Sequence, residues 1–209
     1  MTIPNASVSG ARPSLLDLLA RTSFRLGNFT LSSGAKSDYY IDCRTTTLHA
    51  EGGRLTGLAI LDLLREHNLH PAAVGGLTMG ADPVVSAVAI ASAWRAQHQP
   101  AEPLIHGFLV RKAEKQHGTG RRIEGFLEKD APVLIVDDVC TTGASTITAI
   151  DAAREAGMRV IAAVVLVERE EAGGRAALEA ACQGAPFLRL FTANDVRAAH
   201  LRQFPARSA

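Results

Sequence analysis

Two adjacent carboxylates, Asp137 and Asp138, are the residues of this 209-residue sequence most suited to chemistry. They end the apolar run VLIVDD at 133–138, where burying two charges costs free energy unless a partner offsets the cost. Small residues, TTGAST at 141–146, follow and lead into a helical pattern. Small side chains let backbone N–H groups approach an anion, and a helix N-terminus adds a positive partial charge. We therefore predict a phosphate site directly behind an acid pair.

This loop matches neither of the two common nucleotide-binding fingerprints. The pattern G-x-x-x-x-G-K-[ST] is absent, and so is G-x-G-x-x-G, and the acids precede the loop rather than follow it. The alternative is ordinary Ser/Thr capping of a helix, which is the default for an isolated TTGAS. The apolar strand and the acid pair in front of the loop favour the phosphate site.

A second candidate is the cationic run RKAEKQHGTGRR at 111–122, the densest in the sequence. Its two glycines permit a mobile loop, and its cations suit a polyanion such as pyrophosphate. We predict a mobile catalytic loop over 111–122 that closes as a lid and excludes water. The alternative is a solvated surface loop, which a charge run usually forms.

The remaining residues must form a scaffold that positions these loops. Strands are expected at 72–77, 103–110, 133–138, 159–168 and 186–191, helices at 14–23, 50–67, 83–97, 146–157 and 172–183, and a hairpin within 29–42. The central strands are apolar on both faces, which indicates a mostly parallel sheet covered by helices on both sides. Ligands of such sheets bind beyond the carboxyl ends of the strands.

Composition limits the class of protein. The net charge of +1 argues against a nucleic-acid or membrane-surface partner, so a charged ligand must be held by a local patch. Three widely spaced cysteines, Cys43, Cys140 and Cys182, indicate free thiols rather than disulfides or a zinc site, and Cys140 is expected to be a buried small hydrophobe. Without a signal-peptide pattern or a membrane-length apolar run, we expect a cytoplasmic protein. Residues 1–209 are expected to form one domain with a flexible tail at 1–12.

The segment VLIVDDVCTTGAST resembles the signature of phosphoribosyltransferases that use 5-phosphoribosyl-1-pyrophosphate (PRPP). This resemblance implies the type I phosphoribosyltransferase fold, an α/β fold whose central, mostly parallel sheet is flanked by helices, with a small N-terminal hood contributing to the base site. It also implies that the two acids hold the ribose hydroxyls and that the loop binds the 5′-phosphate. The PRPP-binding residues implied in this segment are Asp137, Asp138, Val139, Cys140, Thr141, Thr142, Gly143, Ala144 and Ser145.

Two further segments resemble one branch of that family, the orotate phosphoribosyltransferases. These are R-K-x-x-K-x-H-G in the basic loop and FTLSSGAKSDYYID at 29–42. The resemblance implies that PRPP is also bound by Arg111, Lys112, Lys115 and His117. It implies catalytic roles for Lys115, His117, Asp137 and Asp138, and an orotate site formed by Thr141, Arg169, Tyr39 and Tyr40.

Arg169 has an alternative interpretation, a surface salt bridge with Glu168, Glu170 or Glu171. The sequence also departs from some family members at two positions. Ser32 and Met79 stand where those members carry lysine. At Met79 the contact with pyrophosphate would then fall to backbone N–H groups of the Thr78–Ala81 turn.

The resemblance implies transfer of the phosphoribosyl group of PRPP to orotate, giving orotidine 5′-monophosphate and pyrophosphate on the route to UMP. Mg²⁺ is expected to be carried mainly by PRPP, with no protein metal site. A homodimer is expected, in which loop 111–122 completes the neighbouring site. The alternatives are a purine or uracil phosphoribosyltransferase, and a non-catalytic, PRPP-sensing regulator that binds nucleic acid.

Overall fold

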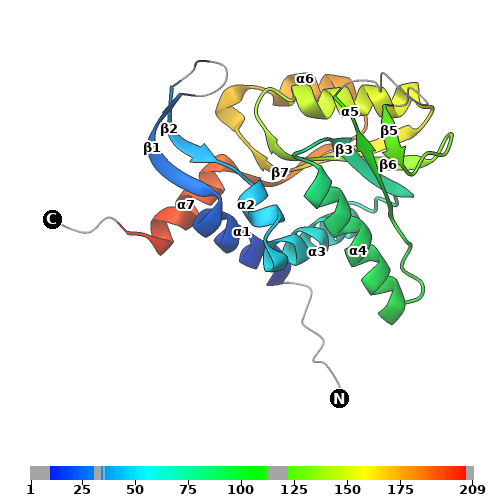
Figure 1. The fold of residues 1–209 in the computed structure, drawn as a ribbon, viewed down its shortest axis with the longest axis horizontal. Helices are drawn as coiled ribbons and strands as arrows, with labels where there is room; N and C mark the ends of the chain where they lie inside the picture. Colours follow the sequence, from blue (N-terminus) through cyan, green and yellow to red (C-terminus); the bar gives the residue numbers. More distant parts are fainter. Residues whose placement is uncertain (1–9, 31–33, 35, 113–121, 206–209) are drawn as a thin grey trace.

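A six-stranded sheet forms the centre of the molecule, with strand order β5-β4-β3-β6-β7-β8 (Figure 1). The computed structural model describes residues 10–30, 34, 36–112 and 122–205. Neighbouring strands are parallel except β5, which pairs antiparallel with β4. The strands are β3 (Ala73–Leu77), β4 (His106–Val110), β5 (Ile123–Gly125), β6 (Pro132–Cys140), β7 (Arg159–Glu168) and β8 (Phe187–Thr192). This confirms the predicted α/β class with a mostly parallel sheet.

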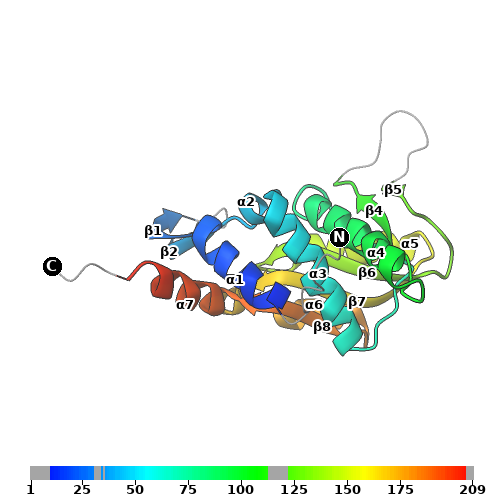
Figure 2. The same ribbon diagram turned by 90° about the horizontal axis from the view of Figure 1, so that it is seen from below.

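Helices cover both faces of this sheet, as the apolar strands predict. Figure 1 shows α3 (Ala50–Glu66) and α4 (Asp82–His98) on one face, and α5 (Ala144–Glu155) and α6 (Arg175–Cys182) on the other. Figure 2 shows α1 (Ala11–Thr22) beside α7 (Ala193–Gln203). Two short elements complete the fold, α2 (Arg44–Thr47) and the 3₁₀ turn η2 (Glu170–Ala172).

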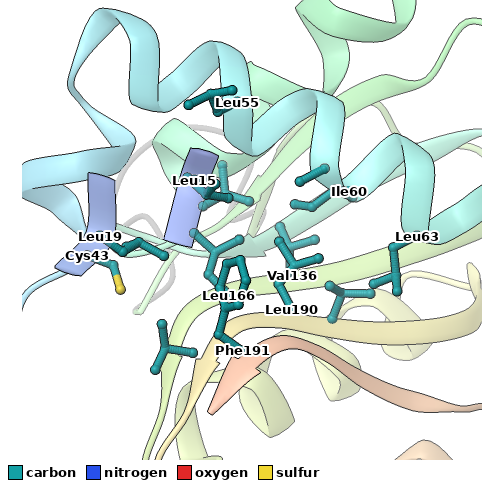
Figure 3. Packing of buried hydrophobic residues seen from close by; sticks show 14 of the residues in the cluster. Leu15, Leu19, Cys43, Leu55, Ile60, Leu63, Val136, Leu166, Leu190 and Phe191 are labelled. Carbon is teal, nitrogen blue, oxygen red and sulfur yellow. The ribbon is translucent and has the colours of Figure 1, made fainter. Parts of the chain in front are cut away.

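Residues along the central strands alternate between two hydrophobic cores. On β6, Leu134 and Val136 pack into the core shared with α1 and α3, whereas Val133 and Ile135 face the core beneath α5. Figure 3 shows the first core, where Val136 and Leu166 of the sheet meet the helical side chains Leu15 and Ile60. Burial on both faces holds β6 rigidly, so the residues at its carboxyl end are placed by two cores at once.

The N-terminal hairpin, which we call the hood, pairs β1 (Phe24–Thr30) antiparallel with β2 (Lys36–Ile41). Its inner side is anchored by the rings of Phe24 and Tyr39, which stack with centroids 5.4 Å apart. Phe24 also contacts the ring of His200 on α7 at 5.1 Å. The hood is therefore fixed to the body of the protein by an aromatic cluster, and Figure 1 shows it projecting at one end of the sheet.

The first helix differs from its predicted bounds. It begins at Ala11 rather than at a cap on Ser14, so the predicted tail over 1–12 is wrong for its last residues. Ala11 is buried, and the Arg12 guanidinium donates to the carbonyl oxygen of Leu190 at 2.7 Å. Pro13 lies in the first turn, where its missing N–H costs nothing.

In the part of the chain that the structure describes, no helix is both long enough and apolar enough to cross a membrane.

Candidate active site

Several of the residues predicted to be functional follow strands that end at the same edge of the sheet, the carboxyl-end edge. The parallel strands β3, β4, β6 and β7 end there together, and the segments that follow them are 78–81, 111–112, 141–143 and 169–173. This is the edge at which open α/β sheets bind ligands. The strand β6 continues through the acid pair to Cys140, two residues beyond its predicted end.

The acid pair is held by hydrogen bonds, with Asp137 buried and Asp138 half-buried. Asp137 is 5% exposed, and its Oδ2 accepts a hydrogen bond from the Thr146 hydroxyl at 3.1 Å. Its Oδ1 accepts from the backbone N–H of Asp138 at 3.0 Å. The Oδ1 of Asp138 accepts in turn from the N–H of Val139 at 2.8 Å. These bonds fix one side of each carboxylate.

Burial makes these carboxylates weak acids. It raises the pKa of Asp137 to about 7, with a further increase from the neighbouring charge of Asp138, against the hydrogen bonds from the Asp138 N–H and Thr146. Burial also raises the pKa of Asp138, opposed by the Val139 N–H and by the charge of Arg44. A pair of this kind favours a ligand that brings hydroxyl donors, because those donors stabilise the charged form.

The predicted phosphate loop turns sharply at Gly143, whose φ of 81° lies in the left-handed region that favours glycine. The helix α5 starts immediately afterwards at Ala144, two residues before its predicted start. The first N–H groups of a helix have no acceptor within the helix, so they are available to an anion. Around this turn Thr142, Ala144 and Ser145 are exposed and Thr141 is half-buried.

Two residues of the same segment point elsewhere. The side chains of Val139 and Cys140 pack into the two cores, so PRPP could meet only their backbone. Cys140 is 1% exposed, as the sequence predicts. Burial, and then the charge of Glu168, raises the pKa of its thiol to about 11, so the thiol stays protonated and unreactive at neutral pH.

The turn after β3 lies against the acid pair. A Cβ atom placed on Gly80 would come within 2.7 Å of Asp138 Oδ1, and Met79 is 66% exposed. Two of the N–H groups predicted to meet pyrophosphate are already engaged. Thr78 donates to the Val110 carbonyl at 2.9 Å and Ala81 to the Leu77 carbonyl at 3.3 Å. Of the four N–H groups in this turn, those of Met79 and Gly80 are therefore the ones left for the predicted contact with pyrophosphate.

The basic loop begins and ends at this edge as well. Arg111 follows β4, its N–H donates to the Arg122 carbonyl at 2.8 Å, and its guanidinium lies 3.5 Å from a carboxylate oxygen of Glu124. Lys112 is exposed. The other predicted residues of this loop, Lys115 and His117, lie outside the described residues, and so does Ser32 in the hood.

The predicted base-site residues Tyr39 and Arg169 are in contact. The Arg169 guanidinium lies 4.6 Å from the centre of the Tyr39 ring, and its Nε donates to the Tyr39 hydroxyl at 2.9 Å. It also donates to the Ser37 hydroxyl at 3.2 Å and to Glu171 Oε1 at 3.1 Å. Arg169 is 8% exposed, so the predicted alternative of a surface salt bridge describes only its contact with Glu171.

Tyr40, the other predicted base-site tyrosine, is not brought to Arg169. Successive residues of a strand point to opposite faces, so Tyr39 is buried while Tyr40 is 41% exposed. The Tyr40 ring packs 5.5 Å from Phe29 on the neighbouring strand.

Two arrangements beside the site were not predicted. Asp42 pairs with Arg44 at 2.9 Å, and the charge of Arg44 acts on Asp138. Glu168, considered above only as a surface partner of Arg169, is 2% exposed and lies between Arg175 and Arg189. The burial of Glu168 could have been predicted as it was for Asp137, because both acids stand at the end of an apolar strand.

The described residues contain no group of three or more His, Cys, Asp or Glu side chains that could hold a metal ion.

Comparison with known proteins agrees with this geometry. A model of the phosphoribosyl transferase domain matches residues 58–178. An orotate phosphoribosyltransferase from Thermosynechococcus vestitus is 42% identical over 193 residues, covering 92% of this chain and 96% of that protein. One from Streptomyces avermitilis is 43% identical over 176 residues, covering 84% and 91%.

Solved structures give the same result. An orotate phosphoribosyltransferase of Mycobacterium tuberculosis matches with a TM-score of 0.74 and 36% identity, covering 89% of this chain and 98% of that one. Its complex with PRPP matches with a TM-score of 0.70 and 33% identity, covering 90% and 99%. An adenine phosphoribosyltransferase from Rhodothermus marinus, at 20% identity and a TM-score of 0.55, shares the fold alone.

The fold and the acid-pair loop define a phosphoribosyltransferase, and the chain belongs to that family. Within it, the chain belongs to the orotate phosphoribosyltransferases. The predicted alternatives, a purine or uracil enzyme and a regulator, are not favoured by these relatives.

Proposed function

We propose that the site at the carboxyl-end edge transfers the phosphoribosyl group of PRPP to N1 of orotate. The observation that carries this assignment is that two groups lie at the same edge, the acid pair of β6, with its buried Asp137, and the buried Arg169 after β7. The acid pair suits the hydroxyls of a ribose. The guanidinium suits the carboxylate that distinguishes orotate from other bases.

The reaction breaks the bond between C1′ and the pyrophosphate oxygen and forms the bond between C1′ and N1. Bond breaking runs ahead, so positive charge grows on the ribose while negative charge leaves with pyrophosphate. Asp137 and Asp138 hold the ribose hydroxyls and stabilise the first charge, and the turn at Gly143 holds the 5′-phosphate. In this role the Thr146 hydroxyl keeps the Asp137 carboxylate oriented toward the sugar.

The leaving pyrophosphate is stabilised by the basic loop, with Arg111, Lys112, Lys115 and His117 as donors. Closure of residues 111–122 over the site would exclude water, which would otherwise hydrolyse PRPP. The antiparallel pairing of β4 with β5 supports this role, because it fixes both ends of the loop at the edge of the sheet, and β4 lies beside β3.

Mg²⁺ fits this site as a partner of the substrate. The carboxylates of Asp137 and Asp138 are hard oxygen donors, the kind that Mg²⁺ accepts, and Mg²⁺ commonly binds through one or two carboxylates and the substrate's phosphates. When bound, the ion neutralises charge on the leaving pyrophosphate. We place the protein in the cytoplasm, where free thiols such as the buried Cys43 and Cys182 stay reduced.

The active form proposed is a homodimer in which loop 111–122 serves the neighbouring site. A groove of about 710 Å³ between α2–α3 and α4 supports this assembly. Leu48, Ile90 and Trp94 line it with exposed apolar side chains. Two buried polar atoms in its lining, Thr47 Oγ1 and Asp82 Oδ1, have no hydrogen-bond partner among the described residues. Because the groove begins beside the turn after β3, a second copy seated there would lie close to the active site.

Replacing Arg169 by glutamine tests the assignment of the base site. The variant loses the charge that would pair with the orotate carboxylate, so KM for orotate should rise at least tenfold while KM for PRPP changes little. Steady-state kinetics with each substrate varied in turn measures the split. An unchanged KM for orotate would show that the carboxylate is recognised elsewhere.

A further inference from the structure

Glu171 forms an ion pair with the Arg169 guanidinium, the group that the proposed function assigns to the carboxylate of orotate. Its Oε1 accepts a hydrogen bond from Arg169 Nε at 3.1 Å and another from the Tyr39 hydroxyl. Burial opposes ionisation of Glu171, but the hydrogen bonds from Tyr39, its own backbone and Arg169 outweigh it and hold the pKa of this carboxyl below its usual range. The residue is therefore a carboxylate at neutral pH.

The two partners differ in their exposure to water. The Arg169 side chain is 10% exposed, whereas that of Glu171 is 53% exposed. Glu171 lies on η2, a single 3₁₀ turn at the surface, while Arg169 is held from the hood by Tyr39 and Ser37. The carboxylate can leave for water at small cost, but the guanidinium cannot follow it without giving up its contacts with the hood.

We propose that Glu171 is an internal stand-in for the substrate carboxylate, which occupies Arg169 and Tyr39 in the free protein and is displaced when orotate binds. This inference rests on the proposed role of Arg169 in orotate binding. Binding exchanges one carboxylate for another on the same guanidinium, so Glu171 keeps a buried cation paired between turnovers. An unpaired buried cation would be costly.

The exchange also sets how strongly the site prefers one base over another. A base without a carboxylate, such as uracil, offers nothing to replace Glu171 and gains nothing from Arg169. A base with a carboxylate competes directly for the guanidinium. Glu171 thus lowers the affinity for orotate by the strength of a partly exposed ion pair and leaves the affinity for uracil unchanged, so it limits how strongly Arg169 favours orotate over uracil.

The test is Glu171→Gln, with Glu170→Gln as the matched control. Glu170 lies on the same turn but pairs with Arg189, at 2.9 Å. Orotate and uracil are titrated by calorimetry into wild type and both variants, and KM and kcat are measured for orotate and PRPP. We expect Glu171→Gln to bind orotate about two- to fivefold more tightly, the range for such an ion pair, with unchanged affinity for uracil and unchanged KM for PRPP. Glu170→Gln should match wild type.

An orotate affinity that is unchanged or weaker in Glu171→Gln would overturn the stand-in role, and a weaker one would make Glu171 a positioning residue. Circular dichroism checks folding, and Glu171→Ala replaces the glutamine variant if that variant misfolds. The proposed function is judged separately. Wild-type protein that binds orotate but does not turn it over with PRPP would overturn that function, while the ratio of orotate affinities would still decide the role of Glu171.

Discussion

The single residue Asp137 lowers the stability of the folded protein at neutral pH, because its carboxyl group is buried in the candidate site. The carboxyl group lies near the end of a strand buried on both faces, and among the described residues its side-chain donor is the Thr146 hydroxyl. Burial therefore favours the neutral form, and the pKa rises from 3.8 to about 7. Groups arranged in this way are common where function requires a charge that folding alone would not keep.

The first prediction follows from that shift. Between about pH 4 and pH 7 the folded protein holds the Asp137 proton more tightly than the unfolded chain, so stability from this group is full below pH 4 and is lost as the pH rises to about 7. Asp137→Asn cannot ionise. Its Tm should exceed that of wild type by at least about 2–4 °C near pH 8, the equivalent of about 1 kcal/mol, and by much less near pH 4.

The measurement is thermal unfolding across that pH range, with turnover measured in parallel. Asp151→Asn, a change at an exposed acid on α5, is the control and should track wild type. Asp137→Asn should also lose turnover by about 100-fold or more. A Tm below that of wild type near pH 8 would contradict the account of this carboxylate.

For single residues, the sequence predicts the site residues that stand at the ends of apolar strands. It does not predict the residues that hydrogen-bond to them. Asp137 and Asp138 are found because they end a run of apolar strand residues, and Arg169, which follows another apolar strand, is found from the family resemblance. Thr146 is not assigned a role, because its bond to Asp137 depends on where α5 starts. Tyr39 and Tyr40 are adjacent in sequence, so only the register of the hood tells which of them faces Arg169.

The start of α6 packs closely against the backbone of the phosphate loop. A Cβ atom on Gly174, the residue before α6, would lie 2.3 Å from the Thr141 carbonyl oxygen and 2.7 Å from the Thr142 carbonyl carbon. Both neighbours are backbone atoms, so the loop itself would have to move. The position of the phosphate loop therefore depends on this glycine.

The second prediction is that Gly174→Ala raises KM for PRPP at least tenfold and lowers the free energy of unfolding by about 1–3 kcal/mol, the usual cost of overpacking. Gly10→Ala is the control, since a Cβ there meets nothing within 4 Å. Steady-state kinetics and denaturant unfolding give the two values. A KM for PRPP like that of wild type would show that the loop does not depend on this contact.

The third prediction concerns the basic loop. Lys115→Ala should lower turnover by about 100- to 1000-fold, the loss usually seen when one well-aimed donor to a developing charge is removed. Circular dichroism should be unchanged. Lys129→Ala, at an exposed lysine in the segment that leads into β6, should keep full turnover. Near wild-type turnover in Lys115→Ala would exclude this lysine from the catalytic loop.

Element prediction succeeds where periodicity is strong and fails for short or polar elements. The strands β6 and β7 and the helix α3 were found from their apolar pattern. The four-residue α2 and three-residue β5 are too short to show a period, and tertiary pairing creates them. The helix α7 was missed although Thr192 and Asp195 form its capping box, because its residues are mostly polar.

For the whole molecule, the groove between α2–α3 and α4 is an exposed apolar surface that the proposed dimer would cover. Trp94 is 54% exposed at its edge, and Ile90 is 70% exposed one turn away on the same helix. Apolar patches of this kind are typical of protein interfaces. Covering the groove with a second copy would also allow each basic loop to serve its neighbour.

The fourth prediction is that Trp94→Glu converts the proposed dimer to a monomer and lowers turnover at least tenfold at low protein concentration. An unpaired charge buried in an interface is strongly destabilising, as the high cost of breaking buried pairs shows. Sedimentation velocity gives the mass, against 22.1 kDa for one chain. Leu104→Glu is the control at an equally exposed apolar residue outside the groove. A wild-type monomer with full turnover would contradict the shared site.

The central claim, that this edge of the sheet joins orotate to the phosphoribosyl group of PRPP, is tested most directly by one assay. PRPP consumption is measured against orotate, uracil, adenine and hypoxanthine in turn, each with and without Mg²⁺. The account predicts turnover with orotate and Mg²⁺, with orotidine 5′-monophosphate and pyrophosphate formed in equal amounts, and turnover at least 100-fold lower with the other three bases. Equal or faster turnover with any base that lacks a carboxylate would contradict it.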